Sequence, residues 1–60
     1  MAMKMGDYLV SVGVLTENQV ADVIRIQKEG DTRKFGDIAV SQGFMEEGSI
    51  KRFNEYVAAN

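Results

Sequence analysis

Lysine and glycine recur together, thirty residues apart, at the two places where this sequence begins a helical segment: Lys4 precedes Gly6, and Lys34 precedes Gly36. The first N–H groups of a helix have no carbonyl partner, and a glycine there places no Cβ between them and a ligand. The nearby lysine adds a positive charge, so each pair suits a phosphate group. Glycine is also tolerated at helix starts and close helix crossings for packing reasons, and that structural role is an equal alternative.

Two other polar features accompany these pairs. Asp7 and Asp37 repeat at the same spacing, but acidic residues in a first helical turn ordinarily complement the helix dipole, which favours a structural role. Gln27 continues the apolar stripe of Val20 and Ile24. It either ends the core at the surface or forms a hydrogen bond with a ligand there.

The composition excludes most catalytic chemistry. The sequence contains no Cys and no His, so it lacks thiolate nucleophiles, disulfides and the commonest general base and transition-metal ligand. No Gly-x4-Gly-Lys-Ser/Thr phosphate loop is present. We therefore expect a protein that binds rather than an enzyme, with no catalytic residue, no metal site and no cofactor. The net charge of −2 predicts no DNA or RNA partner.

An internal repeat organises the chain. Residues 4–13 align with residues 34–43, and six of these ten positions are identical. Val20 then aligns with Ile50, and Val23 with Phe53. The alignment predicts one domain at 4–60 with pseudo-two-fold symmetry, built from repeat 1 at 4–30 and repeat 2 at 34–57. Residues 1–3 precede the pattern and are expected to be disordered or a remnant of cloning.

Each repeat is predicted to contain two helices, which gives an all-α fold of about four helices. In repeat 1, a helix opening at Gly6 ends at Gly13, and Thr16 with Gln19 forms a capping box for a helix that Gly30 ends. In repeat 2, Gly36 to Gln42 is helical and Gly43 ends it, and a further helix follows. The apolar positions at helical spacing are Leu9, Val10, Val12, Val20, Val23, Ile24, Ile50, Phe53, Tyr56 and Val57.

The pattern resembles the tandem-motif amino-terminal domain of type II secretion and type IV pilus assembly ATPases, the MshEN family. That family repeats a motif of Arg-Leu-Gly, apolar residues, a Gly, and later Leu, Leu and Gln at helical spacing. The residues that fall on the motif in register are Lys4, Met5, Gly6, Leu9, Gly13, Val20, Ile24 and Gln27. Lys replaces the family Arg in both copies, and Val57 stands where the second copy would carry its Gln.

The resemblance implies a bacterial secretion, pilus or signalling system and a nucleotide ligand, cyclic di-GMP, whose two halves contact the two motif copies. It places the first half-site at Lys4, Met5, Gly6, Val20, Ile24 and Gln27. It places the second half-site at Lys34, Phe35, Gly36, Ile50 and the neighbourhood of Asn54.

A protein-docking domain with a degenerate nucleotide motif is the alternative. It would use a helix face around Asn54, Tyr56 and Val57 to contact a secretion or pilus component or the rest of a larger chain. A DNA-binding helix-turn-helix module is the weakest hypothesis, because no helix is basic. No uncharged run approaches the roughly 20 residues that span a bilayer, so we expect a cytoplasmic location without membrane insertion. A thin core also favours attachment to a larger body or a homodimer.

Overall fold

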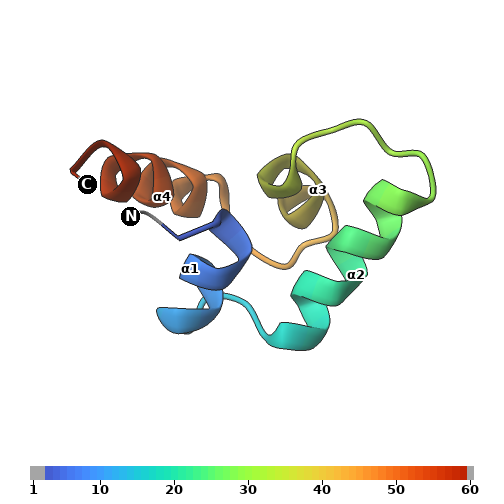
Figure 1. The fold of residues 1–60 in the computed structure, drawn as a ribbon, viewed down its shortest axis with the longest axis horizontal. Coiled ribbons are helices and arrows are strands. Elements are labelled where there is room, and N and C mark those ends of the chain that lie inside the picture. Colours follow the sequence, from blue (N-terminus) through green and yellow to red (C-terminus); the bar gives the residue numbers. More distant parts are fainter. Residues whose placement is uncertain (1–2, 60) are drawn as a thin grey trace.

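The computed structural model describes residues 3–59, which form four helices and contain no strand (Figure 1). The helices are α1 (Met5–Ser11), α2 (Glu17–Lys28), α3 (Phe35–Ser41) and α4 (Glu47–Ala59). The predicted all-α fold with two helices in each repeat is confirmed. Of the residues expected to be disordered or a cloning remnant, 1 and 2 lie outside the described residues, whereas the backbone N–H of Met3 donates to Tyr56 Oη at 3.0 Å.

Glycines end the first three helices as predicted. Gly13, Gly30 and Gly43 have φ angles of 81°, 114° and 76°, in the left-handed region that only glycine adopts without strain. After α1, the N–H of Gly13 donates to the Val10 carbonyl at 3.1 Å and the N–H of Val14 donates to the Leu9 carbonyl at 2.9 Å. These two bonds form a Schellman motif, and the same pair recurs after α2 and α3.

The predicted capping box at the start of α2 is present. The N–H of Gln19 donates to Thr16 Oγ1 at 3.1 Å, and the Gln19 side-chain oxygen accepts from the Thr16 N–H at 2.9 Å. Both bonds satisfy N–H groups that the first helical turn leaves without a partner.

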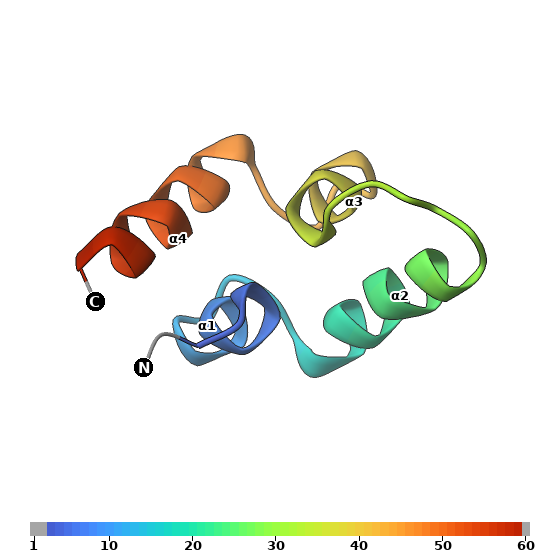
Figure 2. The ribbon, with the colours of Figure 1, turned by 45° about the horizontal axis from the view of Figure 1, so that its top comes forward.

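The two repeats interlock rather than fold side by side. Helix α2 packs on α3 of the other repeat, and α4 packs on α1 and α3 (Figure 2). The buried core is drawn from both repeats and from the loops after α1 and α3. Its residues are Leu9, Leu15, Val23, Ile38, Ala39 and Met45. Leu15 and Met45 occupy equivalent loop positions, so the core follows the repeat.

Three predicted members of the apolar stripes are exposed instead. Val12 lies after the last residue of α1 and is 45% exposed, because the Schellman turn directs the chain away from the core. Ile24 and Val57 are 41% and 42% exposed, because both lie at the edge of the face that their helix buries.

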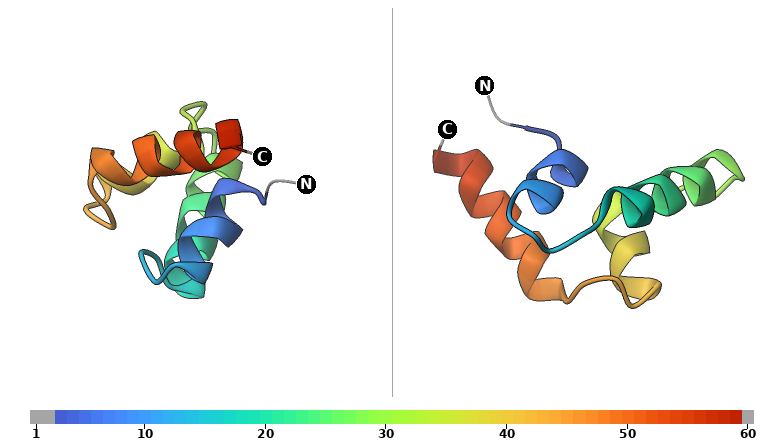
Figure 3. Two further views of the ribbon diagram at one scale, coloured as in Figure 1. Left: turned by 90° about the vertical axis from the view of Figure 1, so that its left-hand side faces the viewer. Right: turned by 90° about the horizontal axis from the view of Figure 1, so that it is seen from below.

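An aromatic cluster joins α1 to α4, which lie side by side in Figure 3. The Tyr8 ring stacks on Tyr56 with centroids 4.4 Å apart and meets Phe53 edge-on at 5.6 Å. At the equivalent α2–α3 contact the corresponding residues are aliphatic, including Ile38 and Val23, and these two are buried completely. None of the helices formed by residues 3–59 has the length and apolar composition that crossing a membrane requires.

Candidate functional site

A groove between the repeats gathers residues from α2 and from the starts of α1 and α3. All six residues predicted for the first half-site line it, together with Phe35 from the second set and with Asp7. Its lining residues are Lys4, Met5, Gly6, Asp7, Val20, Ile24, Gln27 and Phe35. The structure thus brings together side chains that are up to 31 positions apart in sequence (4 to 35).

Local geometry explains this grouping. Val20, Ile24 and Gln27 are spaced four and three residues apart, so they share one face of α2. Lys4 has an extended backbone, with φ −65° and ψ 154°, immediately before α1. Its exposed ammonium can reach a ligand at the groove, whereas Gln27 is half-buried and presents both an amide donor and an acceptor.

Gly6, in the first turn of α1, lies against α2 of its own repeat and against the first residue of α3 in the other repeat. A Cβ on Gly6 would lie 3.2 Å from Val20 Cγ1 and 3.3 Å from Phe35 Cζ. These distances are shorter than ordinary van der Waals contact, so the absence of a side chain allows the close approach. The close contacts with Val20 and Phe35 therefore explain why a glycine is needed for packing at this position, which is the alternative to a ligand-binding role.

Gly36 makes the reciprocal contact. A Cβ there would lie 3.0 Å from Met5 Sδ and 3.1 Å from Ile50 Cγ1. Met5 is the repeat equivalent of Phe35, and Ile50 is the equivalent of Val20, so the two glycines are related by the predicted pseudo-two-fold symmetry. Gly36 is buried beneath Met5 and Ile50, whereas Gly6 is partly exposed.

The second predicted half-site is divided between different surfaces. Lys34 is exposed before α3, Phe35 lines the first groove, and Ile50 and Asn54 line a separate hollow between α3 and α4. The other residues of that hollow are Asp37, Val40, Ser41, Glu47 and Lys51. The equivalent positions of repeat 1 line a matching hollow between α1 and α2, so this feature follows the repeat; its residues are Asp7, Val10, Ser11, Glu17 and Val20.

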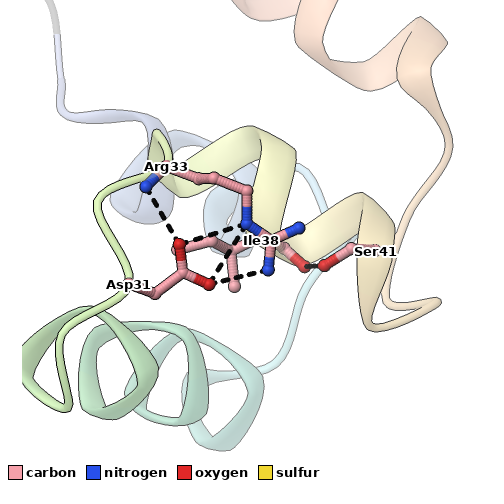
Figure 4. Close-up of polar contacts among 4 residues, drawn as sticks. All are labelled: Asp31, Arg33, Ile38 and Ser41. Carbon is pink, nitrogen blue, oxygen red and sulfur yellow. Dashed lines mark hydrogen bonds and ion pairs between the residues drawn. The ribbon is translucent and has the colours of Figure 1, made fainter.

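The connector between the repeats contains a local ion pair. The Asp31 carboxylate accepts from the Arg33 backbone N–H at 2.9 Å and from the guanidinium at 2.7 to 3.1 Å (Figure 4). The side-chain hydrogen bonds from Arg33 lower the pKa of the Asp31 carboxyl below its ordinary value, and the same bonds raise the pKa of Arg33. In the adjoining helix, the Ser41 hydroxyl donates to the Ile38 carbonyl at 2.7 Å. The sequence pattern gave no indication of the Asp31–Arg33 pair.

Within residues 3–59, no three acidic, His or Cys side chains are grouped so that they could hold a metal ion. The groove offers one ammonium, one carboxylate and one amide around apolar walls, so its two charges balance and its polar groups can orient a small ligand. No protein-family model, no curated protein and no solved structure matches this chain.

Proposed function

We propose that this chain is a non-enzymatic, cytoplasmic binding module of a bacterial secretion, pilus or signalling system, and that it binds cyclic di-GMP between its repeats. The groove that contains all six residues predicted for the first half-site together with Phe35 supports this proposal most directly. The motif resemblance to the MshEN family supplies the identity of the ligand.

The groove suits one half of such a dinucleotide. Val20, Ile24 and the Phe35 ring provide apolar contact for the face of a guanine, and the Gln27 amide can both donate to its edge and accept from it. The Lys4 ammonium is available to a phosphate. Because lysine acts as a point charge rather than a planar fork, we expect weaker binding than an arginine in its place would give.

Titration of the isotope-labelled chain with cyclic di-GMP, followed by backbone amide NMR shifts, tests the proposal. Saturable shifts are expected at residues 4–7, 20–27 and 35, with GMP as the control ligand. Gln27→Ala should weaken binding about fivefold, since a hydrogen bond in such a site contributes on the order of 1 kcal/mol. Gln42→Ala is the matched control, because Gln42 is exposed and lies outside the groove. Absence of any shift at millimolar ligand would contradict the proposal.

A protein-docking domain is the second candidate. The separation of Phe35 from Ile50 and Asn54 favours it, as does the exposure of Val57 at 42% on α4. Under this alternative a secretion or pilus component, or the rest of a larger chain, contacts α4. Loss of partner capture by Val57→Glu, with no response of the groove to nucleotide, would distinguish it.

A further inference from the structure

The connector between the repeats, residues 29–33, differs from the other two loops in its contribution to the core. The loop after α1 supplies Leu15 and the loop after α3 supplies Met45, and both side chains are buried. In the connector only Asp31 is half-buried, and the other residues are exposed. The connector can therefore change its path without uncovering the core, whereas the other two loops cannot.

The bonds of the connector do not tie it to repeat 2. Glu29 pairs with Arg25 of α2, the helix that it follows, and Arg33 pairs with Asp31 inside the connector. The backbone N–H of Asp31 donates to the carbonyl of Ile26, which also belongs to α2. Within residues 3–59, no hydrogen bond or ion pair joins residues 29–33 to α3 or α4, so redirecting the connector breaks no bond with the other repeat.

The helices of repeat 1 pack mainly on the helices of repeat 2. Helix α2 packs on α3, and α1 packs on both α3 and α4, whereas α1 and α2 make no comparable contact with each other in the described part of the chain. Val23 of α2 and Ile38 of α3 are completely buried in the shared core. Each repeat therefore needs a second repeat beside it, and either the same chain or another copy can supply that repeat.

We propose that two copies of this chain exchange their repeats about the connector. Repeat 1 of each copy then packs on repeat 2 of the other, and every helix contact in the dimer is one that a single chain already makes. The single chain holds its repeats at an effective concentration on the order of millimolar, so the exchanged dimer becomes populated as the protein reaches a comparable concentration. The second copy needs no additional surface on which to dock.

The exchange divides the ligand groove between two chains. Lys4, Val20 and Gln27 come from repeat 1 of one copy, and the partner's Phe35 completes the groove from repeat 2. The dimer therefore contains two complete grooves, and each groove is built from both copies. This arrangement follows from the packing of the repeats and holds whatever ligand the groove binds.

Complementation between two destabilised variants tests the exchange. Val23→Lys damages repeat 1 and Ile38→Glu damages repeat 2, because each places a charge at a completely buried position, so each variant alone should be largely unfolded. When the two are refolded together at about millimolar concentration, repeat 1 of the Ile38→Glu chain can pack on repeat 2 of the Val23→Lys chain, and both of these repeats are undamaged. Circular dichroism should then show restored helicity, and sedimentation should show a dimer. A mixture that stays unfolded overturns the proposal.

Leu15→Lys provides the matched control, because Leu15 is buried and lies in repeat 1, as Val23 does. A mixture of Val23→Lys with Leu15→Lys contains no undamaged copy of repeat 1 and should stay unfolded. Restored helicity in this mixture would contradict the exchange, because the recovery would then not depend on pairing an intact repeat 1 with an intact repeat 2.

The unchanged chain provides a second measurement. Refolding it from urea at about millimolar concentration should yield a dimer that size-exclusion chromatography separates from the monomer. The backbone amide NMR shifts of this dimer should match those of the monomer throughout the four helices and differ only near residues 29–33, because the helix contacts are the same in both forms. The absence of a dimer, or shifts that change along an exposed helix face, would refute the exchange.

Discussion

Individual glycines in this chain have different tasks even where the sequence pattern treats them alike. Gly13, Gly30 and Gly43 supply positive φ angles at helix ends. Gly36 instead supplies space, because Met5 and Ile50 lie over it. Sequence spacing identified the terminators because a left-handed residue after a helix has few alternatives to glycine. It could not decide between packing and ligand contact at Gly36, since both need a missing Cβ.

Gly36 and Gly48 form a matched pair for testing this distinction, because each is the second residue of its helix. Gly48→Ala meets nothing within 4 Å and should raise the free energy of unfolding by up to about 1 kcal/mol through helix propensity. Gly36→Ala forces contacts of 3.0 and 3.1 Å and should lower it by about 1 kcal/mol or more. Urea unfolding followed by circular dichroism measures both. Equal stabilisation by the two substitutions would show that Met5 and Ile50 can shift to make room for a Cβ at position 36.

The Asp31–Arg33 pair predicts a pH dependence whose sign is defined. Since hydrogen bonds from Arg33 lower the pKa of Asp31 in the folded chain, the pair stabilises the fold above the ordinary aspartate pKa of about 3.9. That stability is lost as the pH falls through the lower, folded-state pKa. Arg33→Gln should raise the Asp31 midpoint towards the ordinary value in a carboxyl NMR titration. A midpoint that does not move would show that the hydrogen bonds from Arg33 to the Asp31 carboxylate do not form in solution.

At the scale of elements, the two long helices begin differently. Thr16 caps α2 through both bonds of a capping box, whereas Glu46 occupies the equivalent position before α4. Thr16→Ala should lower the free energy of unfolding by about 1 kcal/mol, and Glu46→Thr should raise it by about 0.5–1 kcal/mol, because threonine is the better cap. Thermal unfolding of the two variants checks the opposite signs. Two losses of similar size would indicate that Glu46 already caps α4 well.

The helices themselves could be predicted from the sequence, but which helices pack against one another could not. Local signals such as Thr16–Gln19 and the glycines act within one turn, so they are visible in the order of residues. The burial of Leu15, the exposure of Ile24 and the meeting of Tyr8 with Tyr56 depend on which helices pack together. That Lys4, Val20 and Gln27 would lie near one another could be predicted because they belong to one repeat, whereas Phe35 joins their groove through tertiary packing alone.

In the whole molecule, each repeat completes the core of the other. Val23 of α2 is fully buried in an interface with α3, and the Tyr8 ring of α1 packs on α4. A single repeat would keep one long helix without its packing surface and one helix of seven residues. Isolated helices shorter than about 12–15 residues are marginal in water, so neither repeat is expected to fold alone.

Cleavage of the chain between Asp31 and Thr32 therefore has a specific expected result. Peptides 1–31 and 32–60 should each be largely unfolded, and mixing them at high concentration should restore helicity, because α2 then regains α3 and α1 regains α4. Circular dichroism of the separate and mixed peptides measures this. Val23→Ala in the first peptide should weaken the reassembly, while Asp22→Ala, an exposed neighbour on the same helix, should not. If either peptide alone were as helical as the intact chain, the repeats would be independent units, and the groove between them would have to form by docking of preformed halves.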